Sequence, residues 1–213
     1  MTTTAASFAD VFTSALRGEV CHVVGLDDVP RRLPVSTWRE SADAGDAALL
    51  QQCVGPTLDI GCGPGRMTEH LARLGHPVLG IDVVGEAIFQ TRERGVAALL
   101  RDVFEPIPGE GRWASALLAD GNIGIGGNPR RLLARVAELL EPGGRAIVDL
   151  EAPGTGLRTR TVRLETGSRQ CRPFPWSVVG AEAIGLVTAG TGLSVTSLHQ
   201  HGERWFAILT RGA

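Results

Sequence analysis

The stretch LDIGCGPGR, residues 58–66, places three glycines and a proline directly after a short apolar run. Gly61, Gly63 and Gly65 can take backbone angles that are forbidden to other residues. Their missing side chains would also let a ligand approach the main chain, and open α/β folds bind ligands at the carboxyl ends of their strands. The stretch therefore predicts a strand that carries Asp59 into a ligand-binding turn.

The chain after Thr57 alternates short apolar runs with helical patterns, in the order TLDIG, RMTEHLARLG, HPVLGIDVV and GEAIFQTRERG. This alternation predicts a doubly wound α/β fold, with a mostly parallel sheet and helices on both faces. A further helix is expected over 129–141, with Asn128 as its N-cap and Pro129 at its first position. The last two strands should be joined at Gly202 and run antiparallel.

We expect one main domain over 57–213, preceded by a small N-terminal cap of helices and loops over 1–56. An inserted arm over about 155–176 alternates like two strands around Gly167. The length of 213 residues suits a single domain with modest extensions.

The composition excludes several classes of function. The chain has 21 basic and 23 acidic side chains, and every basic one is arginine. A net charge of -2 gives no general attraction to nucleic acid or to an anionic membrane. The absence of lysine excludes Schiff-base chemistry and a P-loop lysine. The four dispersed cysteines and the lack of a signal peptide or an apolar run of about 20 residues favour a soluble, cytoplasmic protein with no membrane span.

Two cofactor classes use a glycine-rich first turn. The dinucleotide fingerprint G-x-G-x-x-G/A requires a small residue at position 66, where this chain has arginine. Pro64, and the acid at Asp59 two residues before the first glycine, also weigh against NAD. An NAD-type oxidoreductase nevertheless stays as an alternative.

The stretch DIGCGPG, residues 59–65, resembles the first motif of the class I S-adenosylmethionine-dependent methyltransferases, D/E-x-G-x-G-x-G. The resemblance covers about residues 55–150, since GIDVV, RDVFEPIP, LLADGNIG and LLEPGGRAIVDL follow in the family's order. It implies the family's seven-stranded sheet with an antiparallel last strand, and S-adenosylmethionine as cofactor.

The resemblance also implies residue roles. Asp82 would accept hydrogen bonds from both ribose hydroxyls, Asp102 would meet the adenine amino group, and the segment near Asp120 would lie by the methionine portion. A carboxylate can accept two such protons at once. The implied cofactor-binding residues are Asp59, Gly61, Cys62, Gly63, Gly65, Arg66, Asp82, Val83, Asp102, Val103, Asp120 and Gly121.

Structural alternatives stay open for several of these residues. Asp82 could cap the following helix, and Asp102 could be a turn residue. Cys62 could be a small buried filler rather than a nucleophile. Arg66 could pair with the cofactor's carboxylate or lie on the helix surface.

Methyl transfer needs mainly the alignment of the cofactor and the acceptor, so the reaction requires no fixed set of catalytic residues that a sequence motif would reveal. Asp120 and Asn122 are the candidates for contact with the substrate, with a plain turn role as the alternative for Asn122. His22, in the cap, is a further candidate. No cluster with metal-ligand spacing stands out, so no metal is expected. The arginines of the arm, with Trp176, could meet an anionic or flat substrate, or a partner subunit, with a solvated hairpin as the favoured alternative.

These observations predict methyl transfer from S-adenosylmethionine to an oxygen, nitrogen or carbon of a small molecule, with S-adenosylhomocysteine as product. The amino-methylating signature of nucleic-acid enzymes is absent, which argues against a nucleic-acid acceptor. A homodimer is compatible with the arm. A non-catalytic protein that binds the cofactor is the second alternative.

Overall fold

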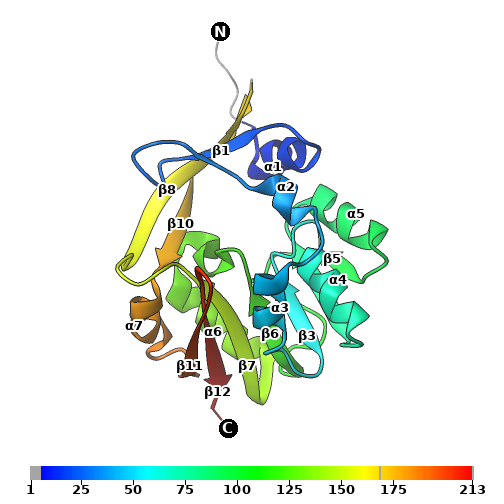
Figure 1. Cartoon of the computed structure of the whole chain (residues 1–213), viewed down its shortest axis with the longest axis vertical. Helices are drawn as coiled ribbons and strands as arrows, with labels where there is room; N and C mark the ends of the chain where they lie inside the picture. The colour runs from blue at the N-terminus through cyan, green and yellow to red at the C-terminus, as the bar shows by residue number, and fades with distance from the viewer. Residues whose placement is uncertain (1–5, 168, 213) are drawn as a thin grey trace.

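A seven-stranded sheet forms the centre of the chain in the computed structural model, which describes residues 6–167 and 169–212. The strand order is β11-β12-β7-β6-β3-β4-β5 (Figure 1). Strands β3 to β7 are mutually parallel, whereas β12 runs antiparallel to β7 and to β11. The predicted fold class is therefore confirmed. The strands are β3 (Thr57–Ile60), β4 (Val78–Asp82), β5 (Ala98–Leu100), β6 (Trp113–Leu118), β7 (Leu140–Leu150), β11 (Leu193–His201) and β12 (Arg204–Arg211).

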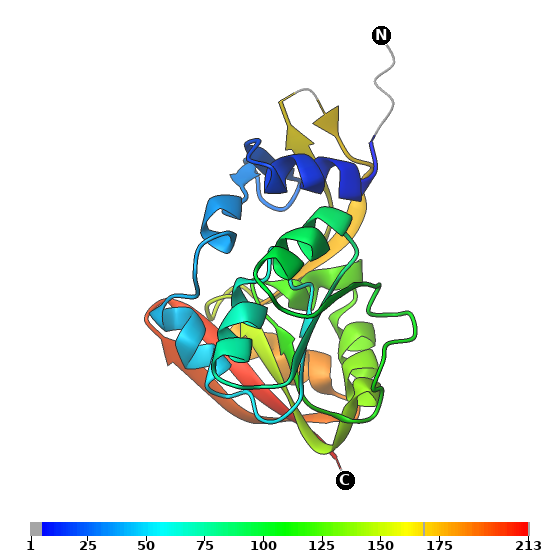
Figure 2. The same cartoon turned by 90° about the vertical axis from the view of Figure 1, so that its right-hand side faces the viewer.

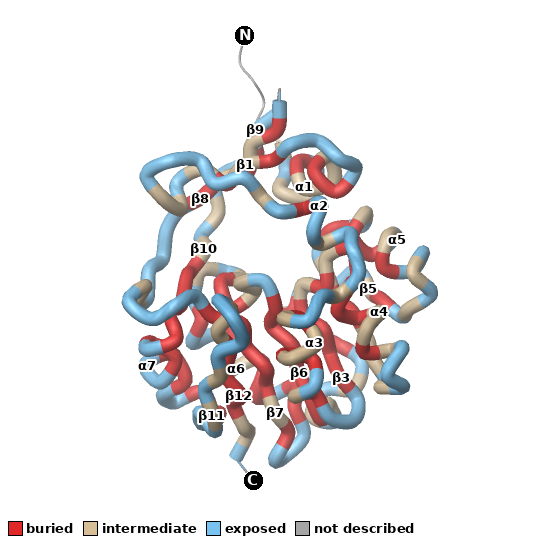
Figure 3. The backbone as a smooth tube through the Cα atoms, in the orientation of Figure 1, coloured by how far each residue is buried: buried red, intermediate tan, exposed pale blue. Residues whose placement is uncertain are grey.

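Helices cover both faces of this sheet because its central strands are apolar on both sides. These strands are largely buried (Figure 3). On β6, Leu117 packs in the cluster of α3 and α4, whereas Ala116 and Leu118 pack in the cluster of α6 and α7. None of the described helices is long and apolar enough to cross a membrane. The helices are α3 (Ala44–Leu50), α4 (Arg66–Arg73), α5 (Gly85–Glu93), α6 (Pro129–Leu139) and α7 (Ile184–Thr188).

Helix α6 begins as predicted. The Asn128 side chain accepts a hydrogen bond from the Arg131 backbone N–H at 3.0 Å, and Pro129 occupies the first helical position. The helix ends earlier than expected, because Leu140 has extended backbone angles and begins β7. Leu140 is nevertheless fully buried. The apolar pattern is thus correct, although the last two residues of the predicted helix belong to the strand.

A second, smaller sheet joins the two segments that we predicted as a cap and an arm. Its order is β10-β8-β1-β2, with β9 paired to β8, and all pairs are antiparallel. The cap therefore contains strands as well as helices, contrary to the expectation of helices and loops. Strand β1 is only four residues long, and its partner β8 lies far away in the sequence. The elements are α1 (Phe8–Leu16), β1 (Cys21–Val24), β2 (Arg31–Arg32), α2 (Val35–Trp38), β8 (Leu157–Thr166), β9 (Arg169–Gln170) and β10 (Phe174–Val179).

This small sheet and its two helices lie above the carboxyl edge of the large sheet (Figures 1 and 2). Strand β10 continues toward the large sheet and contacts the 3-10 segment η1 (Asn122–Gly127) that follows β6. On the other side, α1 contacts α5, where Arg17 pairs with Glu86 at 2.8 Å. The cap is thereby held over the edge at which parallel sheets bind ligands.

The N-cap of α6 can be tested directly. Asn128→Ala removes the side-chain acceptor for the Arg131 N–H, so the free energy of unfolding should fall by about 1 kcal/mol. Asn128→Asp keeps an acceptor and should stay within about 0.5 kcal/mol of the wild type. Urea denaturation followed by circular dichroism measures both values, and equal stability of Asn128→Ala and wild type would contradict the assignment.

Candidate active site

The glycine loop joins β3 to α4, and its three glycines have different structural roles. Their φ angles are +73° at Gly61, +53° at Gly63 and +86° at Gly65, all in the left-handed region. A Cβ at Gly65 would lie 2.7 Å from the Thr91 side chain, whereas a Cβ at Gly63 would meet open space. Gly63 lies in the wall of a large cavity. The loop is therefore packed against α5 at one end and open to a ligand in its middle.

Asp59, the acid of the motif, lies under this loop rather than at its surface. Its side chain is buried and accepts a hydrogen bond from the Thr68 hydroxyl at 2.6 Å. Burial raises the pKa of Asp59 to about 7, and the Thr68 hydrogen bond opposes that rise. The carboxyl group thus fixes the start of α4 against β3 from within the wall of the cavity.

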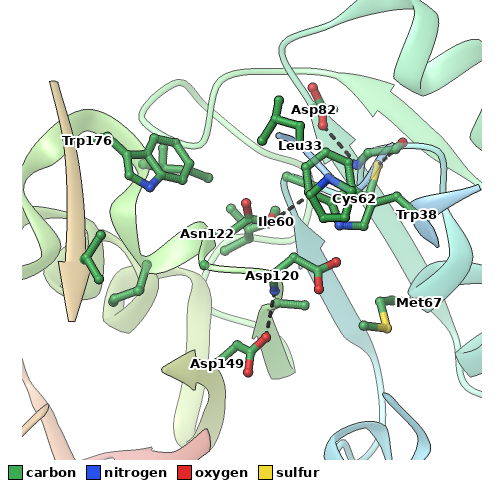
Figure 4. Close-up of a pocket in the computed structure, with 18 of the residues that line it drawn as sticks. Leu33, Trp38, Ile60, Cys62, Met67, Asp82, Asp120, Asn122, Asp149 and Trp176 are labelled. Carbon is green, nitrogen blue, oxygen red and sulfur yellow. Dashed lines mark hydrogen bonds between the residues drawn. The ribbon is translucent and has the colours of Figure 1, made fainter. Parts of the chain in front are cut away.

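Asp82 ends β4 beside the loop, in the cavity wall. One carboxylate oxygen accepts a hydrogen bond from the Gly63 N–H at 3.0 Å, and the other accepts one from the Val84 N–H at 2.9 Å. Burial raises the pKa of Asp82, and these backbone donors oppose the rise. Asp82 is not the cap of the following helix, because the N-cap of α5 is Val84 and no side chain caps this helix. The same carboxylate also ties the tip of β4 to the glycine loop (Figure 4).

Other predicted cofactor residues line the same cavity. Asp102 is exposed and accepts a hydrogen bond from the Phe104 N–H at 2.9 Å, so it is a turn residue as well as part of the wall. Val103, next to it, is buried in the core. Val83 and Gly121 also line the cavity. Cys62 packs as a small filler against Gly80, where a Cβ would lie 2.8 Å from its sulfur, and burial raises the pKa of its thiol.

Arg66 does not lie on the helix surface, and that alternative is wrong. Its guanidinium is buried and donates to both carboxylate oxygens of Asp120 at 2.8 Å each. It also forms an ion pair with the buried Asp46 of α3. Arg204 of β12 binds the same Asp46 and, at 2.7 Å, Asp149 of β7. We call these five side chains the floor network.

Asp120 has the left-handed φ of 51°, which is rare for a residue other than glycine. Its backbone N–H donates to the Asp149 carboxylate at 2.9 Å. Burial raises the pKa of Asp149, and the Arg204 charge opposes that rise. The floor network thus holds the end of β6 in an otherwise unfavourable conformation at the cavity wall.

The Asn122 side chain is committed to the glycine loop. Its amide nitrogen donates to the Ile60 and Gly61 carbonyls at 2.9 Å each. A Cβ at Gly61 would lie 2.7 Å from the same nitrogen. Asn122 is therefore a positioning residue for the loop, which differs from both a substrate contact and a plain turn residue.

The cavity has a volume of about 920 Å³ and reaches from the glycine loop to the small sheet. Figure 4 shows Asp120 and Asn122 between Trp176 on one side and Leu33 and Trp38 on the other. The catalytic prediction for His22 is not supported, since His22 is absent from the described wall. Neighbouring residues of a strand alternate between its faces, and it is Val23 that lines the cavity.

Sequence reasoning missed the parts of the site that depend on long-range contacts. Asp149 follows the apolar run of β7, so its place at the end of a parallel strand was a usable signal. Asp46 and Arg204 carried no such local signal. The roof, the apolar end of the cavity wall, was missed as well, because it combines residues from α1, α2, β8, β10 and the chain around β1 and β2.

Comparison with known proteins identifies the central part of the chain. Residues 57–144 match the family profile described as a methyltransferase domain. The chain is 28% identical over 134 residues to the mitochondrial ubiquinone biosynthesis O-methyltransferase of Arabidopsis thaliana. That alignment covers 60% of this chain and 37% of the relative, so the chain spans well under half of that protein's length.

The fold is similar to solved methyltransferase structures. The S-adenosylmethionine-dependent methyltransferase of Bacteroides fragilis, in complex with S-adenosylhomocysteine, superposes with a TM-score of 0.80 over 99% of each chain at 19% identity. The 1,6-didemethyltoxoflavin-N1-methyltransferase of Burkholderia thailandensis does so with a TM-score of 0.62 over 100% of this chain and 94% of its own, at 17% identity. Residues 57–144 thus match a methyltransferase domain, and the chain has the fold of solved S-adenosylmethionine-dependent methyltransferases.

Proposed function

We propose that this chain binds S-adenosylmethionine at the glycine loop and transfers its methyl group to an oxygen, nitrogen or carbon of a small molecule. The observation that carries the proposal is the hydrogen bond from the Gly63 N–H to the Asp82 carboxylate in the cavity wall. It sets an open stretch of main chain and a carboxylate side by side at the carboxyl ends of two neighbouring strands. The methyltransferase domain matched at residues 57–144 supports the same function.

The residues at this edge fit the parts of the cofactor. Each Asp82 oxygen already accepts one backbone hydrogen bond, and carboxylate oxygens have further lone pairs for two ribose hydroxyls. Asp102 lies at the end of the next strand, where it would meet the adenine amino group beside Val103. Gly63 leaves room in front of the main chain for the nucleoside.

Electrostatics favours this cofactor over a dinucleotide. Asp82 and Asp102 line the loop end of the cavity with one arginine, Arg101, and the three aspartates of the floor network outnumber its two arginines. A cationic sulfonium and ammonium would be attracted there, whereas a pyrophosphate would be repelled. Arg66, which could have met a phosphate, is occupied by two aspartates. These contacts weigh against the NAD alternative.

Alignment is the main contribution that the chain would make to catalysis. When bound, S-adenosylmethionine supplies a methyl group on a positively charged sulfur, which is already activated for displacement. Asn122 would hold the loop in register, and Asp120, fixed by Arg66, would orient the amino group of the methionine portion. The apolar roof would exclude water from the displacement.

The room in the cavity favours an enzyme over a non-catalytic binder. Drug-sized ligands occupy pockets of roughly 300–1,000 Å³, and this cavity of about 920 Å³ continues beyond the glycine loop. The space under the roof is suited to a small-molecule acceptor rather than to nucleic acid, because the roof is apolar. The four cysteines are free and buried, in keeping with a place in the reducing cytoplasm.

The ribose contact is tested by Asp82→Ala. Loss of charge-assisted hydrogen bonds to two hydroxyls should weaken S-adenosylmethionine binding by about 1.5 to 3 kcal/mol, or roughly 10- to 150-fold. Asp28→Ala, an exposed aspartate outside the cavity, should bind as the wild type does. Calorimetric titration measures the affinities, and unchanged binding by a folded Asp82→Ala protein would refute the proposed ribose site.

Close approach to the main chain is tested by Gly63→Val. The added side chain should project into the cavity and abolish binding of S-adenosylmethionine. Gly75→Val is the matched control, since Gly75 has a φ of +84°, open space at its Cβ position and no place in the cavity wall. Both variants carry similar backbone strain, so this strain cannot explain a difference between them. Only Gly63→Val, which fills the cavity, should lose binding. Equal affinity of the two variants would contradict the close-approach argument.

A further inference from the structure

The cavity has two ends of different chemistry. The end at the large sheet carries four members of the floor network, Arg66, Asp120, Asp149 and Arg204. The opposite end, which we call the roof, is formed by α1, α2, β8, β10 and the chain around β1 and β2. Its wall is apolar, with the aliphatic side chains of Leu33 and Leu164 and the aromatic rings of Phe12, Trp38, Phe174 and Trp176.

The charged side chains in the roof already have partners within the chain. Arg31 forms ion pairs with Asp27 at 3.1 Å and with Glu151 at 3.7 Å. Asp43 caps α3, where its carboxylate accepts a hydrogen bond from the Asp46 N–H at 2.8 Å. Arg31, Asp43 and Glu151, the described charged side chains that line the roof, are therefore each engaged by another group of the chain. An ionic group placed there would lose its hydration without gaining a partner.

The arginines of the arm do not change this conclusion. Strand β8 alternates, and its buried residues Val162 and Leu164 line the cavity. Arg158 and Arg160 are exposed and lie outside the described wall of the cavity. The expectation that the arm meets an anionic substrate is thus not met inside this cavity.

The aromatic rings of the roof are held in place by one another. Phe174 stands at right angles to Trp176, with 6.3 Å between ring centroids, and Phe8 meets Phe174 edge-on at 5.1 Å. A Cβ at Gly124 would lie 2.6 Å from the Trp176 indole, so the indole is seated against η1. Trp176 and Trp38 stand on opposite sides of the cavity in Figure 4. Fixed rings of this kind bind flat ligands at a low cost in conformational entropy.

We propose that the methyl acceptor is an uncharged molecule with a flat aromatic portion, held between the roof and the glycine loop. This inference rests on the proposed function, because it assigns the acceptor of the same site. The roof would take the ring system by apolar contact, and the atom to be methylated would face the glycine loop, near Asp120 and Asn122. Charged metabolites of similar size would be excluded by the cost of desolvation.

A matched pair of fluorescent probes tests this inference. N-phenyl-1-naphthylamine is uncharged, and 1-anilinonaphthalene-8-sulfonate has the same rings with one added sulfonate. Both are titrated into the full chain with saturating S-adenosylhomocysteine. We expect saturable binding of the uncharged probe, at least tenfold tighter than that of the sulfonate. Equal or tighter binding of the sulfonate, or no binding of the uncharged probe, would overturn the inference.

Two variants locate the probe. Trp176→Ala should weaken binding of the uncharged probe at least fivefold, with the affinity for S-adenosylhomocysteine changed less than twofold. Trp176→Phe, which keeps a ring, should recover most of the loss. Phe89→Ala removes an exposed ring of α5 outside the cavity and should bind the probe as the wild type does. Unchanged probe affinity in Trp176→Ala would place the probe elsewhere and overturn the inference.

The proposed function and this inference fail in different ways. Calorimetry with S-adenosylhomocysteine alone tests the function, because the product does not need the roof. If the product fails to bind while the uncharged probe binds selectively, the methyltransferase proposal fails and the apolar character of the roof is upheld. If the product binds and the probe shows no preference for the uncharged form, the acceptor assignment fails alone.

Discussion

The buried guanidinium of Arg66 holds together the edge of the sheet at which the site is built. It binds Asp46 of α3 and Asp120 at the end of β6, and Arg204 extends the network to Asp149 of β7. Buried ions are costly to desolvate, so every member depends on its partners. One consequence is that Asp120 stays in a left-handed conformation beside the cavity. The network therefore couples the packing of α3 and α4 to the position of residues that face the ligand.

The division of the cavity follows from how the chain is connected. The charged end comes from the loops of the large sheet, which continue parallel strands and collect at one edge. The apolar end comes from β8 and β10, which are inserted between β7 and β11 and pair with the N-terminal β1. Two distant parts of the sequence, the N-terminal segment and the insertion of β8 to β10, thus cover the cavity. The carboxyl edge of the sheet beneath it comes from the middle of the chain. A change in the roof can alter the acceptor without disturbing the glycine loop.

Local sequence signals predicted the large sheet and much of its edge. The glycine loop and the N-cap at Asn128 act within a few residues of their own strand or helix, so local patterns predicted them. The role of Asp82 was implied by the family resemblance. Arg66 was harder, because its partners Asp46 and Asp120 lie on other elements and no pattern links them. The strand at β1 was missed because four residues without their partner β8 carry little signal. The sequence could not show whether His22 faces the cavity, since only the pairing of β1 shows which face its side chain takes.

The central claim is that the glycine loop makes room for a sulfonium nucleoside. The most direct measurement is a side-by-side calorimetric titration of the purified wild-type chain with S-adenosylmethionine, S-adenosylhomocysteine and NADH. Micromolar binding of the first two, and none of NADH, is the result that the acidic cavity edge and the occupied Arg66 predict. Binding of NADH alone would contradict the claim, and it would mean that the aspartates around the loop do not repel a pyrophosphate.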